Sequence, residues 1–564
     1  MLSPVLRVAR RFGESASAFR AVFGNPGLRS LELAWTASIV AQWAYVVAVS
    51  VYAFDAGGAK AVGFVFLIRL VPAALFAPFA GMLADRHRRE RVLLATNLSR
   101  IALMGAAAVG VFADAAPWIV YALAVAAAVA TTPFRSAQAA LTPALARTPE
   151  ELTAANAVAS GIESLAVFVG PALAGIVLGV TSTGVVFVLT TLLVVTSTVF
   201  VLLIDAPETA RPRSEIEAST IVSEALAGFR AVASHSSLRV MIGLLTAQTA
   251  VAGAVQVFIV VTAIELLDLG DAGVGFLNSA MGVGALVGAV FALSLTGARR
   301  LSPAFMLGVV FWGLPLVAIG LWPQTVLALV LFGVIGVANS FVDVAGLTLV
   351  QRTVPDDVLA RVFGVIQLLW LSSVGIGAMV APLLIDWLGL ENAMIVTGIS
   401  LPLLVALFAR RLVRIDATAE APEHDELRIL ASIPIFTPLP GASLEHLAGR
   451  LVPLRLDPET VIVREGDAGD RFYIVAEGTV EISEYGRPIS ELGPGGYFGE
   501  ISLIRDVPRT ATATSTTPVV LYALDREDFL AAVTSHAPSA EAAEEVVSSR
   551  LAGIPVAGAR LPAG

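Results

Sequence analysis

About twelve apolar stretches, each long enough to cross a lipid bilayer, dominate residues 30–410 and constrain the fold more than any other feature. A spanning helix needs about 20 mostly apolar residues. The stretches lie at 30–53, 62–82, 92–112, 117–143, 154–179, 183–204, 240–264, 273–296, 303–322, 325–350, 362–386 and 391–410. Only 14% of the residues are charged, whereas soluble proteins are nearer one quarter. We therefore predict an all-α, multi-pass membrane domain of twelve helices.

The charges between these stretches predict the orientation of the domain. Arginines gather in one set of loops, most densely between Arg86 and Arg91, and membrane proteins retain Lys and Arg on the cytoplasmic side. The opposite loops carry mainly acids, and Lys60 is the exception. The acids are Asp55, Asp114, Glu265, Asp268, Asp271, Asp386 and Glu391. We predict that the protein lies in the cell inner membrane, in contact with its lipids, with both termini in the cytoplasm.

Internal similarity predicts two six-helix halves, 28–204 and 239–413, joined by a cytoplasmic connector at 205–238. Residues 134–143 read FRSAQAALTP and residues 341–349 read FVDVAGLTL, and each stretch runs into an acidic turn with proline. Corresponding halves are common in transporters, although chance likeness of two apolar helices is the alternative. Residues 1–27 carry arginines among apolar residues. They suit an amphipathic segment on the inner membrane surface or a frayed basic tail.

The arginine-rich loop carries a family resemblance. Residues 81–93 read GMLADRHRRERVL and resemble the major facilitator signature G-x-L-A-D-R-x-G-R-R/K-x-x-L, with Arg88 at the second glycine and Glu90 at a usual basic position. The resemblance implies that four residues act in gating: Gly81, Asp85, Arg86 and Arg89.

The fifth stretch resembles the antiporter motif of the same superfamily, with alanine at three glycine positions. LTP at 141–143 and PEELTAANA at 149–157 look like the enterobactin-exporter and macrolide-efflux branch. The resemblance implies proton-driven export of an amphiphilic small molecule, such as a drug, a siderophore or a lipid-like compound.

Ionisable side chains within the spans are candidates for proton coupling, because a charge inside a bilayer is costly and usually functional. We predict Glu163 and Asp343 as proton carriers, with arginine partners drawn from Arg69, Arg100 and Arg135. A static ion pair that holds helices together is the alternative. Glu32 lies near the inner end of its span, so we expect it at the membrane interface.

The composition changes after Arg414. Residues 414–426 are short and polar and predict a linker, residues 427–551 predict a small β-barrel with flanking helices, and residues 552–564 form a tail. Short alternating strands between glycine-rich turns are typical of such a barrel. The chain has no cysteine, so we expect no thiolate metal site, and the scattered histidines predict no metal site or enzyme. We expect no nucleic-acid partner, because no helix-turn-helix follows.

Residues 498–512, FGEISLIRDVPRTAT, predict a site for a sugar-phosphate. Gly499 allows close backbone approach at the start of a helix whose free N–H groups favour an anion. Arg509 can return to the same pocket and pair with a phosphate, and Glu500 can accept a hydrogen bond from a ribose hydroxyl.

The same run resembles the phosphate-binding cassette of cyclic-nucleotide-binding domains, and GDAGDRFYIVAEG at 466–478 resembles their upstream motif. The resemblance implies that Glu500 holds the 2′-hydroxyl and Arg509 the cyclic phosphate, with backbone contacts from Gly499, Ile501 and Ser502. Thr510 would reach a syn base, which leaves cAMP and cGMP both open. A barrel that kept its shape and lost its ligand is the alternative.

Together these features predict a proton-coupled exporter that is regulated by a cyclic nucleotide and has no enzymatic activity. Three other interpretations stay open: export of the cyclic nucleotide itself, a lipid flippase, and a receptor that does not transport. The sequence does not give the substrate, the sign of regulation or the oligomeric state.

Overall fold

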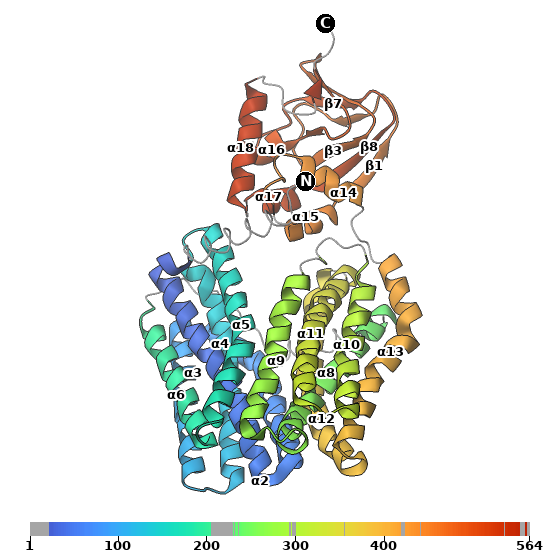
Figure 1. Cartoon of the computed structure of the whole chain (residues 1–564). Helices are drawn as coiled ribbons and strands as arrows, with labels where there is room; N and C mark the ends of the chain where they lie inside the picture. Colours follow the sequence, from blue (N-terminus) through green and yellow to red (C-terminus); the bar gives the residue numbers. More distant parts are fainter. Residues whose placement is uncertain are drawn as a thin grey trace. The chain divides into compact units, whose positions relative to one another are not determined.

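The computed structural model describes residues 22–204, 229–230, 232–234, 236–292, 295, 300–354, 356–418, 424–439, 441–534, 536–552 and 559–560. The described residues up to Thr418 form one compact unit, and those from His424 onward form a second. Figure 1 shows long helices in the first unit and the strands in the second.

Eleven helices among the described residues of the first unit are long and apolar enough to cross a membrane. They are α2 (Pro26–Arg86), α3 (Arg89–Phe112), α4 (Pro117–Leu145), α5 (Pro149–Leu178), α6 (Thr183–Leu202), α8 (Ser236–Val261), α9 (Gly270–Ala292), α10 (Ser302–Leu321), α11 (Thr325–Thr353), α12 (Asp356–Leu388) and α13 (Leu390–Thr418). A short π-helical turn, η1 (Thr262–Leu266), extends α8. The predicted multi-pass helical domain is confirmed.

Helix α2 is interrupted near its middle by two consecutive glycines. Gly57 and Gly58 have non-helical backbone angles, and Gly58 has φ +62°, a region that glycine enters without steric cost. The interruption divides α2 into two helical segments. If each segment of α2 crosses the membrane, the eleven helices provide twelve spans. The total of twelve stays a prediction, which the division of α2 supports.

Proline and polar caps fix where the helices begin. Pro26, Pro117 and Pro149 stand in first turns, where the missing N–H has no helical partner to lose. The Asn25 side chain accepts hydrogen bonds at the start of α2 and donates to the Leu145 carbonyl at 2.9 Å. This cap therefore ties the start of α2 to the end of α4.

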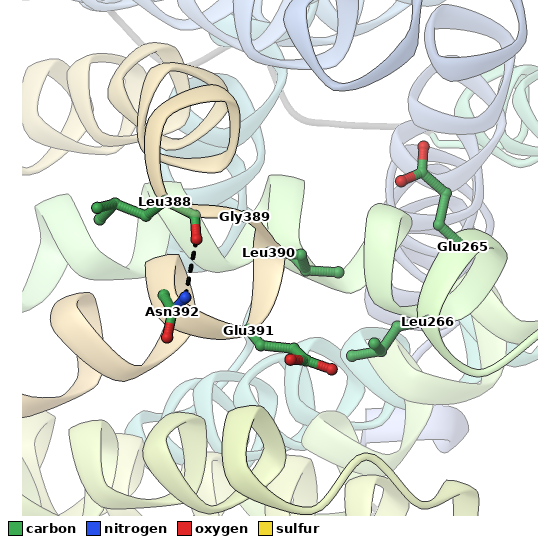
Figure 2. A pocket seen from close by; sticks show the side chains of 7 residues that line it. All are labelled: Glu265, Leu266, Leu388, Gly389, Leu390, Glu391 and Asn392. Carbon is green, nitrogen blue, oxygen red and sulfur yellow. Dashed lines mark hydrogen bonds between the residues drawn. The ribbon is translucent and has the colours of Figure 1, made fainter.

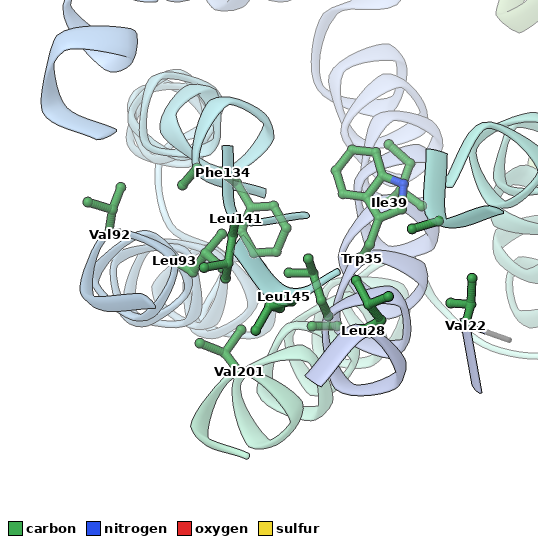
Figure 3. Close-up of a cluster of buried hydrophobic side chains, with 14 of the residues drawn as sticks. Val22, Leu28, Trp35, Ile39, Val92, Leu93, Phe134, Leu141, Leu145 and Val201 are labelled. Carbon is green, nitrogen blue, oxygen red and sulfur yellow. The ribbon is translucent and has the colours of Figure 1, made fainter. Parts of the chain in front are cut away.

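An apolar core holds the N-terminal half together (Figure 3). Leu28 and Trp35 of α2 lie in one buried cluster with Leu93 of α3 and Leu141 of α4. The rings of Trp35 and Phe134 stack with centroids 6.0 Å apart. In a bilayer such contacts depend on close packing, because lipid tails are as apolar as leucine.

The two halves of the first unit meet through small residues. A Cβ added to Gly275 of α9 would lie 2.4 Å from the Gly175 Cα of α5, and one on Gly63 of α2 would lie 2.3 Å from the Ala378 oxygen of α12. Glycine at these positions lets the helix backbones touch. The contacts lie toward the helix ends opposite to the Arg86–Arg91 loop, near an ion pair of 2.8 Å between Lys60 and Asp386.

The second unit is a small antiparallel β-structure with flanking helices, as predicted. Its sheets have the strand orders β1-β8-β3-β6 and β2-β7-β4-β5-β9. The strands are β1 (Val452–Leu456), β2 (Val461–Val463), β3 (Arg471–Glu477), β4 (Val480–Glu484), β5 (Arg487–Leu492), β6 (Tyr497–Phe498), β7 (Thr512–Ser515), β8 (Val519–Asp525) and β9 (Ala559–Arg560). The helices are α14 (His424–Ser432), α15 (Gly441–Ala448), α16 (Glu500–Arg505), α17 (Arg526–Thr534) and α18 (Ala537–Leu551).

Aromatic packing positions the helices of this unit on its sheet. The ring of Phe472 in β3 stacks on Phe529 of α17, with centroids 4.8 Å apart, and Phe436 meets both rings edge-on. Val546 of α18 lies in the same buried cluster. The packing of this cluster therefore holds α18 near the segment that contains α16.

Candidate functional site

Gly499 forms the turn between β6 and α16, and no other residue fits there. Its φ is +97°, a conformation that L side chains rarely adopt. A Cβ on Gly499 would lie 2.6 Å from the Arg509 Nη1 and 2.9 Å from the Arg471 carbonyl oxygen. Glycine therefore allows the Arg509 guanidinium to lie against the backbone of this turn.

The Arg509 guanidinium is buried and held by groups of its own domain. Nη1 donates to the Ser502 hydroxyl at 2.9 Å and to the Gly499 carbonyl at 3.2 Å. Nη2 donates to the Arg471 carbonyl at 2.7 Å and to the Asp470 carboxylate at 3.0 Å. Its four terminal N–H groups are thus used, while Nε is buried without a partner. The Asp470 side chain is 69% exposed, so it is the contact that a ligand can replace most easily.

Glu500 is the second charged group, and its partner comes from the last helix. Its side chain is 0% exposed, and Oε1 accepts a hydrogen bond from the Arg550 Nη1 at 2.8 Å. The Arg550 Nη2 donates to the Tyr497 carbonyl at 2.8 Å, and its guanidinium lies 4.5 Å from the centroid of the Tyr497 ring. Glu500 Oε2 is also buried and has no hydrogen-bond partner among the described residues, so one acceptor is left unsatisfied.

Tyr497 forms the apolar wall beside this ion pair. Burial raises the pKa of Tyr497 to about 12, although the nearby Arg550 acts in the opposite direction. The phenol is therefore neutral at physiological pH, and the Glu500–Arg550 pair keeps its balance of charge.

The remaining predicted residues lie around these two groups. The Ser502 hydroxyl is buried, accepts from Arg509 and donates to the Gly499 carbonyl at 3.0 Å. Ile501 is half-buried and Thr510 is exposed. The structure thus gathers all six predicted residues of the second unit. It adds Asp470 and Arg550, to which sequence reasoning gave no role.

In the first unit, the structure brings Arg135 and Glu163 together. The Arg135 Nη1 and Nη2 donate to the two Glu163 carboxylate oxygens at 2.8 and 3.0 Å. The pair joins α4 to α5, and both side chains are partly exposed. A bidentate pair of this kind fixes the relative orientation of two helices.

Asp343 lies apart from this pair, in the C-terminal half. Its carboxylate accepts a hydrogen bond from the Asn339 amide at 2.8 Å. Asn339 in turn accepts one from the Trp312 indole at 3.1 Å. In the described part of the chain Asp343 therefore has an amide partner rather than an arginine.

Arg69 and Arg100 pair with neither predicted proton carrier. The Arg69 guanidinium lies 5.7 Å from the centroid of the Tyr45 ring. Arg100 donates to the Ser38 hydroxyl at 2.5 Å and to the Ser38 carbonyl at 3.3 Å.

Neighbouring helices cover Glu32, while its predicted depth at the membrane interface stays a prediction. Glu32 is 0% exposed, and neither carboxylate oxygen has a hydrogen-bond partner. Its place near the end of a span says nothing about which side of the helix is covered by neighbours, and the buried side carries Glu32.

Little of the gating motif can be placed. The backbone of Gly81, Asp85 and Arg86 belongs to α2, but the surroundings of Gly81 and the side chains of Asp85 and Arg86 lie outside the described residues. Arg89, at the start of α3, donates a hydrogen bond to the Ala140 carbonyl of α4. This contact stays within the N-terminal half.

A cavity of about 370 Å³ lies elsewhere, where η1 approaches the turn between α12 and α13 (Figure 2). Glu265 and Glu391 line it, and the Asn392 amide donates to the Leu388 carbonyl at 2.9 Å. None of the predicted site residues lines this cavity, so it does not join the sites described above.

Comparison with known proteins separates the same two regions. Residues 33–304 match the Major Facilitator Superfamily, and residues 453–536 match the cyclic nucleotide-binding domain. The chain is 39% identical over 104 residues to the acetyltransferase Pat of Mycolicibacterium smegmatis, covering 18% of this chain and 31% of that protein.

Two further relatives have cyclic nucleotides in their names. The chain is 45% identical over 91 residues to a cAMP-dependent protein kinase regulatory subunit of Dictyostelium discoideum, which is 15% of this chain and 28% of that protein. It is 34% identical over 128 residues to a cyclic nucleotide-gated potassium channel of Rhizobium etli, which is 23% of this chain and 36% of that protein. The chain thus spans about a third of the length of these curated relatives.

The family matches agree with the fold of each unit. The chain therefore joins a Major Facilitator Superfamily domain to a C-terminal cyclic nucleotide-binding domain.

Proposed function

We propose that the protein is a proton-coupled exporter of an amphiphilic small molecule and that a cyclic nucleotide bound to its C-terminal domain regulates transport. The observation that carries the proposal is the group of charged residues around α16. There Glu500 has one oxygen without a partner among the described residues, Arg509 has an exchangeable carboxylate partner, and Arg550 connects this group to α18.

The ligand we propose for this pocket is cAMP or cGMP. The ribose 2′-hydroxyl would donate to Glu500, and the cyclic phosphate would take the place of the Asp470 carboxylate on Arg509, since guanidinium pairs well with phosphate oxygens. Thr510 is exposed at the rim and would face the base. The named kinase and channel relatives support this class of ligand.

We propose that Arg550 transmits binding to α18. A ribose hydroxyl that bonds to Glu500 changes the carboxylate that holds Arg550, and Arg550 is fixed to α18. A ligand shifts a conformational equilibrium only as far as it binds the two states differently. A hydroxyl on Oε2 would draw negative charge away from Oε1, where Arg550 donates, so the two states would differ in the strength of the Glu500–Arg550 pair.

For the membrane domain we propose alternating access between its two halves, with substrate bound near the bilayer midplane. The backbone contacts of Gly175 with Gly275 and of Gly63 with Ala378 support a state that is closed at the ends assigned to the outside. Glu163 and Asp343 are the proposed proton carriers. Arg135 is the proposed partner of Glu163, and Gly81, Asp85, Arg86 and Arg89 are the proposed gating residues.

We place the protein in the inner membrane with both termini and the nucleotide-binding domain in the cytoplasm, because the arginine-rich loops mark that side. The proposed organisation keeps the predicted boundaries: halves at 28–204 and 239–413, a linker at 414–426 and the nucleotide-binding domain at 427–551. Within the superfamily, we assign the chain to the enterobactin-exporter and macrolide-efflux branch.

The test is transport in vesicles that contain the full-length protein and carry an imposed proton gradient. A panel of lipophilic dyes, siderophores and labelled lipids is assayed with and without cAMP and cGMP, and labelled cAMP is included as a substrate. We expect nucleotide to change the rate in the wild type and to have no effect in Arg509→Ala. Equal rates at saturating nucleotide would contradict regulation. Transport of cAMP itself would replace the exporter proposal.

A further inference from the structure

The N-terminal half of the membrane domain encloses two arginines that have no acidic partner among the described residues. Arg69 and Arg100 are 8% and 1% exposed. Within the described part of the chain, Arg100 is hydrogen-bonded only to Ser38, and Arg69 lies over the Tyr45 ring without a hydrogen bond. The Arg135–Glu163 pair and the Asp343–Asn339 contact involve other groups. Two positive charges are thus uncompensated within one half.

Tyr45 lies close to Arg69 and on the same side of α2 as Ser38, the partner of Arg100. Ser38, which binds Arg100, and Tyr45, which faces Arg69, are seven residues apart on α2, so they lie two turns apart on one side of the helix. Both arginines are close enough to act electrostatically on Tyr45. The Tyr45 ring is also fixed edge-on against Phe187 of α6, with centroids 5.2 Å apart. The three groups therefore form one cluster, with Arg69, Arg100 and Tyr45 as its members.

This cluster has unused hydrogen-bond donors. The Nε atoms of Arg69 and Arg100 and the Tyr45 hydroxyl are buried without partners. The two terminal nitrogens of Arg69 also lack hydrogen bonds among the described residues. Unlike Nε, they are not fully buried, so a small ligand could reach them. Buried polar groups are normally satisfied, and each exception requires an explanation such as a missing water or ion.

The charge cannot be removed by loss of a proton, because a guanidinium keeps its proton in proteins. An unpaired charge in a low-dielectric interior costs several kcal/mol. Glu32 is the nearest buried acid along α2, but neither of its oxygens has a partner, and it lies six residues before Ser38, on a different side of the helix. Among the described residues no acid is paired with either arginine, so a bound anion is a source for the missing counter-charge.

We propose that the cluster of Arg69, Arg100 and Tyr45 binds a small anionic group. The accessible Arg69 nitrogens would be its main donors, the Tyr45 hydroxyl would add a third hydrogen bond, and Arg100 would contribute its charge from the enclosed side. A halide ion or the carboxylate of an amphiphile has this chemistry. The proposal does not depend on export or on nucleotide regulation. Its failure would therefore leave the proposed function unaffected.

The experiment uses the full-length protein in nanodiscs of uncharged lipid. One arm measures the unfolding temperature in increasing chloride at constant ionic strength, with gluconate as the replacing anion, because its hydroxyl-bearing chain is strongly hydrated, unlike the alkyl chain of the acid in the other arm. The other arm titrates 11-(dansylamino)undecanoic acid and its primary amide, followed by dansyl fluorescence. Stabilisation by chloride identifies a resident ion, and preference for the acid over the amide identifies the head group of a ligand.

We expect at least one arm to respond in the wild type, and Arg69→Gln to weaken that response about tenfold or more, as expected when a hydrogen bond to a charge is lost. Tyr45→Phe removes only the hydroxyl and should give a smaller loss in a folded protein, which covers the case in which Arg69→Gln does not fold. Arg147→Gln is the matched control, because Arg147 is exposed in a loop, and it should respond as the wild type does.

Two results would overturn the proposal. The first is a wild type that responds neither to chloride nor to the acid. The second is an anion response that survives unchanged in both Arg69→Gln and Tyr45→Phe. If Glu32 supplies the counter-charge instead, Glu32→Gln will destabilise the protein as much as Arg69→Gln does, and the wild type will show no anion effect.

Discussion

Buried charges are treated differently in the two units of this protein. In the nucleotide-binding domain Glu500 is paired with Arg550, and Arg509 is paired with Asp470. In the N-terminal half of the membrane domain Arg69, Arg100 and Glu32 have no charged partner among the described residues. A site whose charges are already paired can stand without its ligand and exchange one partner for another. A site with unpaired charges needs a ligand to be stable, because a lone buried charge is costly.

The largest effect is expected at Arg509. There the comparison predicts that the cyclic phosphate of the ligand replaces the Asp470 carboxylate. Arg509→Ala removes the phosphate partner and should weaken binding of cAMP about 100-fold or more. Calorimetry of the full-length protein measures the loss. Arg455→Ala is the control, since Arg455 is exposed on β1 of the same domain. Unchanged heat of binding in Arg509→Ala would place the ligand elsewhere.

The next effect concerns an ion pair of the membrane domain, Arg135 with Glu163. If Glu163 carries protons, Glu163→Gln should lower proton-driven transport about tenfold, equivalent to about 1.4 kcal/mol, and the exchanged pair Arg135→Glu with Glu163→Arg should not recover it. Initial rates in vesicles give the measurement. Recovery by the exchanged pair would show that the ion pair only holds α4 and α5 together.

Arg550→Ala should have a smaller effect on nucleotide affinity, but a clear effect on how nucleotide binding is transmitted to α18. Glu500 and Arg509 remain, so affinity for cAMP should stay within about tenfold of the wild type, the range of one hydrogen bond to a charge. Hydrogen exchange of α18 should no longer change when cAMP is added, because the link to Glu500 is gone. A wild-type response of α18 in this variant would mean that another contact transmits binding.

The smallest effect is expected for the exposed pair of Arg471 with Asp525, at 2.7 Å. Arg471 donates this hydrogen bond to the Asp525 carboxylate, and the bond raises the pKa of Arg471. Water screens such pairs, and Asp525→Asn should cost at most about 1 kcal/mol. Hydrogen exchange of the β3 and β8 amides measures this. If Asp525→Asn lowered the free energy of unfolding by several kcal/mol, exposed ion pairs would stabilise this domain as much as buried ones, contrary to the comparison.

The residues of the nucleotide pocket that sequence analysis identified are those that lie close together in the chain. Gly499, Glu500, Ser502 and Arg509 occupy one short segment, so one turn and one short helix bring them together. Arg550 lies fifty residues after Glu500, and its contact depends on how α18 packs on the core. No local pattern encodes that packing, so its role could not be predicted.

In the membrane domain the apolar stretches and the arginine-rich loops gave the helices, but not the partners of buried charges. Arg135 and Glu163 lie on consecutive antiparallel helices, which makes their pairing one of several that the sequence allowed. The burial of Glu32 was missed because distance along a span does not tell which side of the helix faces its neighbours. Leu28 and Trp35, one turn before and after Glu32, lie in the buried cluster with residues of α3 and α4, so neighbouring helices cover that side of α2.

The carboxylate on Arg509 has a consequence for the response of the nucleotide domain to salt. Binding of a cyclic phosphate would release Asp470 into water as the phosphate arrives, so the pocket trades one negative group for another. Few dissolved counterions are then displaced. The affinity for cyclic nucleotide should consequently vary little with ionic strength, and the sensor would keep its threshold when a cell is exposed to osmotic stress.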